Sequence, residues 1–231
     1  MKKLPNHVAI IMDGNSRWAQ KKDLSKEKGH KAGVKKARLA VEFFLENGIK
    51  ELTLFAFSTE NWLREEVEVR DLISLFFDAL EEQTPELREE KVKLNFIGDI
   101  SRFNKKLIKQ IEKSKKLTEE YEPRLNLIIA ASYGGKWDII NAVKKFYADK
   151  NNIELNENSL ENYLETKNFP NPDLIIRSGG EKRLSNFYLW QSSYSELFFS
   201  NKLWPDFNAK DFDTAIEDFR SRKRKFGVES G

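Results

Sequence analysis

The sequence contains no cysteine and only two histidines, His7 and His30. A chain without cysteine forms no disulfide, thiolate zinc site, iron–sulfur cluster or cysteine nucleophile, and two histidines are too few for a multi-histidine metal site. Long apolar runs are missing as well. The runs 8–12 and 127–131 are far shorter than the ~20 residues that span a bilayer. The first is also too short for a signal peptide, because it stops at Asp13. We therefore expect a cytoplasmic protein.

Neither sign of charge is in large excess, since 40 lysines and arginines stand against 37 aspartates and glutamates. The basic excess is concentrated near the carboxyl terminus, in Arg220, Arg222, Lys223, Arg224 and Lys225. The remainder of the chain predicts no general attraction to nucleic acid. The basic segment has two interpretations. It is either a solvated helix end that favours the helix dipole, or a nucleic-acid-binding segment whose binding weakens with salt and disappears on truncation after Phe219.

Large apolar side chains are sufficient for a sizeable core, because the 231 residues include 17 Phe, 5 Trp and 6 Tyr. Short apolar runs alternate with segments of helical periodicity, which is typical of α/β proteins. We predict strands at residues 8–12, 52–57, 92–97, 125–131 and 174–177, with an edge strand at 197–199. We predict helices at residues 30–46, 66–83, 101–120, 137–149, 159–167 and 209–225. The sequence thus predicts one domain over residues 1–231, with a central, mostly parallel sheet of about six strands flanked by helices.

Several residues predict where these helices begin or end. Gly48 should end the first helix and Pro85 the second, Ser101 should cap the third, and Ser159 with Asn162 should start the fifth. The helix at 66–83 is unusual because its apolar residues occupy more than one face, whereas a covering helix has one apolar stripe about 100° wide. It therefore lies deep in the core or at a subunit interface, or it lines an apolar cavity.

Polar residues gather where the predicted strands end, which is where open α/β sheets bind ligands. The segments 13–18, 58–64 and 177–183 follow the first, second and fifth strands, and they are rich in Gly, Arg, carboxylates and amides. Asp13 followed by Gly14, and Arg177 followed by Ser178-Gly179-Gly180, favour a crevice that holds a phosphate with its divalent cation. Ordinary turns and surface ion pairs are the alternative for each residue alone. Trp18 and Trp62 in these segments either anchor a loop to the core or line the ligand site.

The ordered motifs along most of the chain resemble those of the cis-prenyltransferases. The opening block His7-Val-Ala-Ile-Ile-Met-Asp13-Gly-Asn-Ser-Arg-Trp-Ala19 carries the resemblance first. Further matching blocks are Gly29-His-Lys-Ala-Gly33, Phe57-Ser-Thr-Glu-Asn-Trp62 with Arg64, Ile97-Gly-Asp99 with Ser101-Arg-Phe103, Tyr133-Gly-Gly135, Ile176-Arg-Ser-Gly-Gly-Glu181, Arg183-Leu-Ser-Asn-Phe187, Trp190-Gln191, Tyr194, Glu196 and Leu203-Trp-Pro-Asp-Phe207. Any single block would be weak, but so many in order make a chance resemblance implausible.

The resemblance implies repeated condensation of isopentenyl diphosphate onto an allylic diphosphate such as farnesyl diphosphate, with each new double bond cis. The product would be a long-chain polyprenyl diphosphate such as undecaprenyl diphosphate, a precursor of the cell-wall lipid carrier. The apolar excess of the helix at 66–83 would then wall a tunnel for the growing chain. The resemblance also implies a homodimer with residues 192–200 near the interface, and at most peripheral contact with the inner face of the membrane for product release.

Site roles follow from the same resemblance. Asp13 and Glu196 would associate with Mg²⁺. The allylic substrate would be bound by Gly14, Asn15, Ser16, Arg17, Trp18, Lys26 and His30. Isopentenyl diphosphate would be bound by Arg177, Arg183, Leu184 and Ser185. A loop that closes over both substrates would contain Ser58, Thr59, Glu60, Asn61, Trp62 and Arg64. Asn61 is expected to orient a diphosphate oxygen or a water during proton removal, because a neutral amide is not a useful base.

The chain departs from the family pattern at three positions of the crevice. Ser16 stands where Gly is common, Lys26 where Arg is usual, and Lys182 where the best-known bacterial members have His, so no metal role is transferred to Lys182. Two alternatives to an active synthase are a catalytically silent family subunit and a Mg²⁺-dependent phosphohydrolase with Asp13 as its nucleophile. Elongation by the purified protein would exclude the first, and phosphate release without elongation would favour the second.

Overall fold

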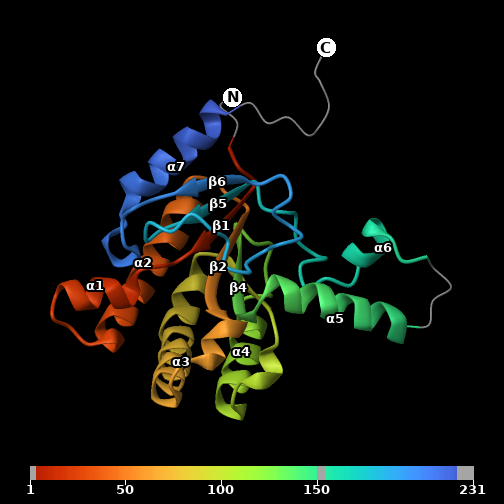
Figure 1. The fold of residues 1–231 in the computed structure, drawn as a ribbon, viewed down its shortest axis with the longest axis horizontal. Coiled ribbons are helices and arrows are strands. Elements are labelled where there is room, and N and C mark those ends of the chain that lie inside the picture. The colour runs from red at the N-terminus through yellow and green to blue at the C-terminus, as the bar shows by residue number, and fades with distance from the viewer. Residues whose placement is uncertain (1–3, 150–153, 223–231) are drawn as a thin grey trace.

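The computed structural model describes residues 4–149 and 154–222, and it contains one α/β domain built on a sheet of six parallel strands (Figure 1). The strands lie in the order β3-β4-β2-β1-β5-β6. Their bounds are β1 His7–Ile11, β2 Glu51–Ser58, β3 Val92–Ile97, β4 Leu125–Tyr133, β5 Leu174–Arg177 and β6 Glu196–Phe199. All six predicted strands are confirmed. The sheet is fully parallel, because each strand is followed by a crossover before the next one.

Helices cover both faces of this sheet, as Figure 1 shows. Their bounds are α1 Asn15–Lys21, α2 Lys26–Glu46, α3 Glu66–Glu89, α4 Lys105–Leu117, α5 Gly135–Ala148, α6 Glu157–Glu161 and α7 Ala209–Ser221. The larger hydrophobic cluster joins α2, α3, α4 and α7 to one face of the sheet. A second cluster packs Phe187, Tyr188 and the start of α5 on the other face. Burial on both sides explains why the central strands, such as β1 and β5, are almost wholly apolar.

Several helix boundaries differ from the sequence predictions. The helix α4, which was predicted to start at Ser101, starts at Lys105 with Asn104 as its cap. Ser101 lies in a 3₁₀ turn and donates to Asp99 instead. The helix predicted at 159–167 is the short α6, capped by Asn156, whose side chain accepts from the Ser159 N–H. The helix α3, which was predicted to end at Pro85, continues through this proline to Glu89. This extension buries Leu87, and that burial outweighs the missing proline N–H.

A helix that the sequence did not predict, α1, directly follows β1. Gly14 at its amino end has φ +110°, a left-handed conformation that reverses the chain out of the sheet. A Cβ at this position would also lie 2.8 Å from Leu203 Cδ2. The helix α2 begins at Lys26, four residues before the predicted start, with the Ser25 side chain as its cap. The turn between α1 and α2 places both helix faces beside the end of β1.

Candidate active site

The candidate site lies beyond the carboxyl ends of β1 and β5, which are adjacent strands. Their register pairs Ile11 with Arg177, so Asp13 follows directly beside the Arg177 side chain. One carboxylate oxygen of Asp13 lies 2.9 Å from Arg177 Nη2, and the other lies 3.1 Å from Arg17 Nη2. The Arg177 side chain is only 4% exposed, whereas Asp13 is 28% exposed. Asp13 therefore sits between a buried and a solvent-exposed guanidinium.

Arg177 also holds the segment that follows β5. Its Nη1 donates to Ser185 Oγ at 2.8 Å and to the backbone carbonyl of Arg183. Its buried Nε has no hydrogen-bond partner among the described residues. A buried donor without a partner is costly unless a ligand or water satisfies it. The guanidinium of Arg177 is thus held by neighbouring groups while one donor remains available.

Two further groups complete the charge pattern of the crevice. Glu181 lies 2.5 Å from Arg183 Nη1 and 3.9 Å from Arg17 Nη1. Three arginines therefore face two carboxylates, Asp13 and Glu181. Guanidinium groups bind phosphate oxygens through paired hydrogen bonds.

The predicted allylic side of the site is formed by α1 and α2. Gly33 on α2 lies so close to α1 that a Cβ there would be 2.3 Å from Asn15 Oδ1. Asn15 Oδ1 is buried and without a hydrogen-bond partner among the described residues. His30 Nε2 lies 3.4 Å from Ser16 Oγ. Burial lowers the pKa of His30, and the nearby Arg64 guanidinium lowers it further, so the imidazole is neutral at pH 7.

The Glu68 carboxylate contacts both Lys26 and Arg64, the other two cationic residues predicted on this side of the site. Glu68 on α3 lies 2.9 Å from Lys26 Nζ and 2.7 Å from Arg64 Nη1. Its own side chain is 16% exposed. Lys26 reaches Glu68 from the start of α2, so Glu68 fixes the spacing between α2 and α3 at the crevice. Glu68 was not predicted as a site residue, because a glutamate among several acids at a helix start is ordinary.

The predicted closing loop forms a short 3₁₀ helix, Thr59–Leu63, directly after β2. Asn61 Oδ1 accepts from the Ser58 backbone N–H at 2.9 Å. The Asn61 Nδ2 group makes no hydrogen bond within the described residues, so it is free to donate to a ligand oxygen. Trp62 packs against Phe57 and Phe103, which shows that this tryptophan anchors the loop to the core.

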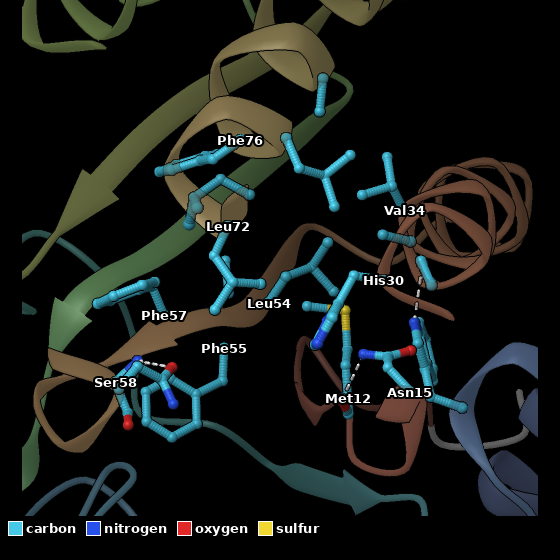
Figure 2. A pocket seen from close by; sticks show the side chains of 18 of the residues that line it. Met12, Asn15, His30, Val34, Leu54, Phe55, Phe57, Ser58, Leu72 and Phe76 are labelled. Atoms are coloured by element: carbon cyan, nitrogen blue, oxygen red, sulfur yellow. Dashed lines mark hydrogen bonds between the residues drawn. The ribbon is translucent and has the colours of Figure 1, made fainter. Parts of the chain in front are cut away.

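A pocket of about 320 Å³ extends from these polar groups into the domain. Its polar lining consists of Asp13, Asn15, His30, Ser58, Asn61, Arg64, Gln83 and Ser185. The apolar lining comes from β2, α2 and α3. Figure 2 shows Asn15 and Ser58 at one end, with Leu72 and Phe76 of α3 at the other. The apolar excess on α3 is therefore divided between this pocket and the packing of α3 against α4.

The structure does not bring every predicted residue to this pocket. Glu196 opens β6 and pairs with Leu174, so it lies at the amino end of the sheet, about 10 Å of strand rise from the level of Arg177. Its carboxylate is bound by Arg222 at 2.7 Å. Within one chain, Glu196 therefore does not share a metal site with Asp13. Trp18 lies on α1, and its Nε1 donates to Asp206 at 2.7 Å instead of lining the pocket.

Comparisons with known proteins agree with this geometry. A family model described as putative undecaprenyl diphosphate synthase matches residues 11–227. A ditrans,polycis-undecaprenyl-diphosphate synthase ((2E,6E)-farnesyl-diphosphate specific) of Coxiella burnetii is 46% identical over 230 residues and covers 97% of each chain. An isoprenyl transferase of Thermotoga maritima is also 46% identical, with 97% of each chain covered.

Two solved structures have the same fold over nearly the whole chain. Lavandulyl diphosphate synthase from Lavandula x intermedia, in complex with dimethylallyl diphosphate, matches with a TM-score of 0.93 and 36% identity. That match covers 97% of this chain and 99% of the other. A probable undecaprenyl diphosphate synthase from Campylobacter jejuni matches with a TM-score of 0.82 and 37% identity, covering 99% and 100%. The chain therefore belongs to the undecaprenyl diphosphate synthase family of prenyltransferases.

Proposed function

We propose that the protein elongates farnesyl diphosphate by repeated addition of isopentenyl diphosphate, with Mg²⁺, to give a long-chain cis-polyprenyl diphosphate such as undecaprenyl diphosphate. The observation that carries this proposal is the continuity of the arginine-rich crevice with the apolar pocket. Diphosphate groups require cationic hydrogen-bond donors, and a growing hydrocarbon requires a dry, apolar space. The relatives whose names specify farnesyl diphosphate support the choice of primer.

Two diphosphates are assigned to the two sides of the crevice. Asn15, His30, Lys26 and Arg64 lie around the pocket mouth on the α2 side, where the allylic diphosphate would enter. Arg177, with the segment that contains Arg183 and Ser185, is on the β5 side, where isopentenyl diphosphate would bind. The hydrocarbon of the allylic substrate would extend along α3 into the pocket. This placement directs the reactive ends of both substrates toward Asp13.

The reaction breaks the allylic carbon–oxygen bond, forms a carbon–carbon bond to isopentenyl diphosphate and releases a proton and diphosphate. Arginine guanidiniums stabilise the negative charge that develops on the departing diphosphate. The apolar wall of the pocket keeps water from the allylic cation. Asn61 Nδ2 can donate to a diphosphate oxygen or hold the water that accepts the proton, because its Oδ1 is already engaged by Ser58.

The donor set of the crevice fits Mg²⁺ bound together with its substrate. Mg²⁺ is usually held by one or two carboxylates plus phosphate oxygens and waters, not by an all-protein cage. Asp13 is a partly exposed carboxylate at the pocket mouth. No group of three or more acidic or histidine side chains that could hold a metal occurs among the described residues, which agrees with this mode of binding. The bound ion would neutralise diphosphate charge in the transition state.

The surface of the domain supports assembly into a homodimer. Three large apolar or aromatic side chains are exposed at the surface. Ile140 and Tyr147 lie on α5 and are 56% and 67% exposed, and Tyr194 lies just before β6 and is 62% exposed. We assign the dimer contact to this surface. No helix of the described chain is apolar and long enough to cross a bilayer. We propose separately, from the family resemblance, that the protein acts in the cytoplasm, in peripheral contact with the membrane that receives its product for cell-wall synthesis.

The purified protein should incorporate labelled isopentenyl diphosphate into a longer chain when it is given farnesyl diphosphate and Mg²⁺. Incorporation should stop with a chelator and return with excess Mg²⁺. Incorporation that persists in the chelator would contradict the metal requirement. No incorporation by the protein alone would contradict the proposal and favour the silent subunit, whereas phosphate release without elongation would favour a phosphohydrolase.

A further inference from the structure

Asn186 connects three segments that the proposed reaction uses together. Its Nδ2 donates to Glu60 Oε1 at 2.7 Å, in the loop after β2. Its Oδ1 accepts from the Lys136 backbone N–H at 2.9 Å, and its own carbonyl accepts from the Gly135 N–H at 2.6 Å, both at the start of α5. One side chain thus spans the loops that follow β2, β4 and β5.

The backbone around Asn186 is held in an uncommon conformation. Ser185, Asn186 and Tyr188 have φ values of +50°, +62° and +44°. Left-handed conformations are costly for residues other than glycine, although asparagine tolerates them better than most. Phe187 anchors the segment, because it is fully buried and stacks on Phe55 of β2 at 4.4 Å. Such a conformation is maintained where the surrounding contacts determine it, and here it directs the Asn186 amide toward Glu60.

Each end of this contact adjoins a residue that lines the pocket. Ser185, the residue before Asn186, accepts from Arg177 and lines the pocket. Asn61, the residue after Glu60, also lines the pocket. There is no space for a larger residue between the segments, since a Cβ at Gly134 would lie 2.4 Å from Thr59 Oγ1 and 2.7 Å from Asn186 Nδ2. A displacement of either segment is therefore transmitted to the other.

We infer that Asn186 is a positioning residue that fastens the loop containing Asn61 to the segment containing Arg183 and Ser185. The inference rests on the proposed function, in which these segments bind isopentenyl diphosphate and close over it. Asn186 itself touches neither substrate in this account. It sets the position of Asn61 relative to Arg177, so that binding of isopentenyl diphosphate and closure of the loop occur together.

The test exchanges the two partners of the hydrogen bond. Asn186→Asp places a carboxylate opposite Glu60, so it removes the donor and adds repulsion, while its remaining oxygen still accepts from Lys136 N–H. Glu60→Gln alone keeps an acceptor for Asn186. The double variant Asn186→Asp/Glu60→Gln restores the bond in the opposite direction, from the Gln amide to the Asp carboxylate. Asn162→Asp, at the carboxyl-terminal cap of α6, is the matched control, since the one hydrogen bond that its Nδ2 donates among the described residues is to Asn158 O at 3.1 Å.

We expect Asn186→Asp to lower kcat/KM for isopentenyl diphosphate about tenfold, the effect of losing one hydrogen bond to a charged group. The double variant should recover most of this loss, and Asn162→Asp should match the wild type. Amide hydrogen exchange of residues 59–63 should accelerate in Asn186→Asp and slow again in the double variant. This second measurement needs no activity, so it tests the contact even if the wild type fails to elongate a chain. Additive losses in the double variant, or unchanged exchange in Asn186→Asp, would overturn the inference.

Discussion

Replacement of Asp13 by asparagine should separate the role of this residue in catalysis from its role in stability. The substitution preserves the shape of the side chain but removes the charge that faces Arg177 and Arg17. Breaking a fully buried ion pair costs about 3–5 kcal/mol. Asp13 is 28% exposed, and Arg177 retains Ser185 Oγ and the Arg183 carbonyl as acceptors. We therefore expect a smaller loss of unfolding free energy, about 1–3 kcal/mol.

A domain of ordinary stability remains folded after this loss, because the free energy of unfolding of such domains is about 5–15 kcal/mol. Turnover should fall much further, by about a thousandfold, which corresponds to about 4 kcal/mol of transition-state stabilisation. The assay compares kcat for isopentenyl diphosphate incorporation with unfolding in urea. Glu165→Gln is the matched control, since Glu165 is 20% exposed, its carboxylate lies 2.6 Å from Nζ of Lys145 on α5, and neither residue lines the pocket. It should lose stability but keep turnover.

Two results would refute this reasoning. If Asp13→Asn retains turnover within about tenfold of the wild type, the carboxylate is not part of the reacting site. If it unfolds the protein, Asp13 is primarily the counter-ion of Arg177, and its loss of activity carries no information about catalysis. The larger structural role of Asp13 was not apparent from the sequence, where a carboxylate at a strand end seemed independent of the core.

Three further changes have defined outcomes. Burial lowers the pKa of His7 to about 4, so the folded state binds this proton less readily than the unfolded state. The free energy of unfolding should therefore fall by about 3 kcal/mol between pH 7 and pH 4. NMR should show a neutral His7 imidazole at pH 5. A His7 signal that titrates near pH 6.5 would contradict this. Gly33→Ala should displace Asn15 and raise KM for the allylic substrate, and an unchanged KM would count against the placement of that substrate. Ala79→Phe should fill the pocket on α3 and shorten the product by mass; unchanged product length would place the hydrocarbon elsewhere.

Much of the fold followed from local pattern, since most strands are short apolar runs bounded by polar residues. Helix boundaries followed less well, because packing determined them. Leu87 carries α3 past Pro85, and the Gly14 turn creates α1 from residues without an apolar period. The grouping of Asp13 and Arg177 was predictable, because parallel strands bring their carboxyl ends to one edge, whereas Ser185 was assigned to the site by the family resemblance alone.

The contacts between the loops were not predictable from the sequence. Glu68 and Asn186 have no signature in the chain, as their roles depend on which segments the fold brings opposite them. Glu196 shows the reverse case. A motif resemblance assigned it to the metal, but its position at the start of β6 places it at the other end of the sheet within one chain. The types and order of residues in the sequence therefore identify the residues of a site, whereas the register of the strands determines which of these residues lie close together.

The mass spectrum of the products formed from farnesyl diphosphate and isopentenyl diphosphate in Mg²⁺ tests the central claim most directly. The continuity of crevice and pocket predicts a series of polyprenyl diphosphates that differ by one isoprene unit and end at a defined long chain. Farnesyl diphosphate recovered unchanged, or only a single condensation, would contradict the claim that this pocket receives a growing chain.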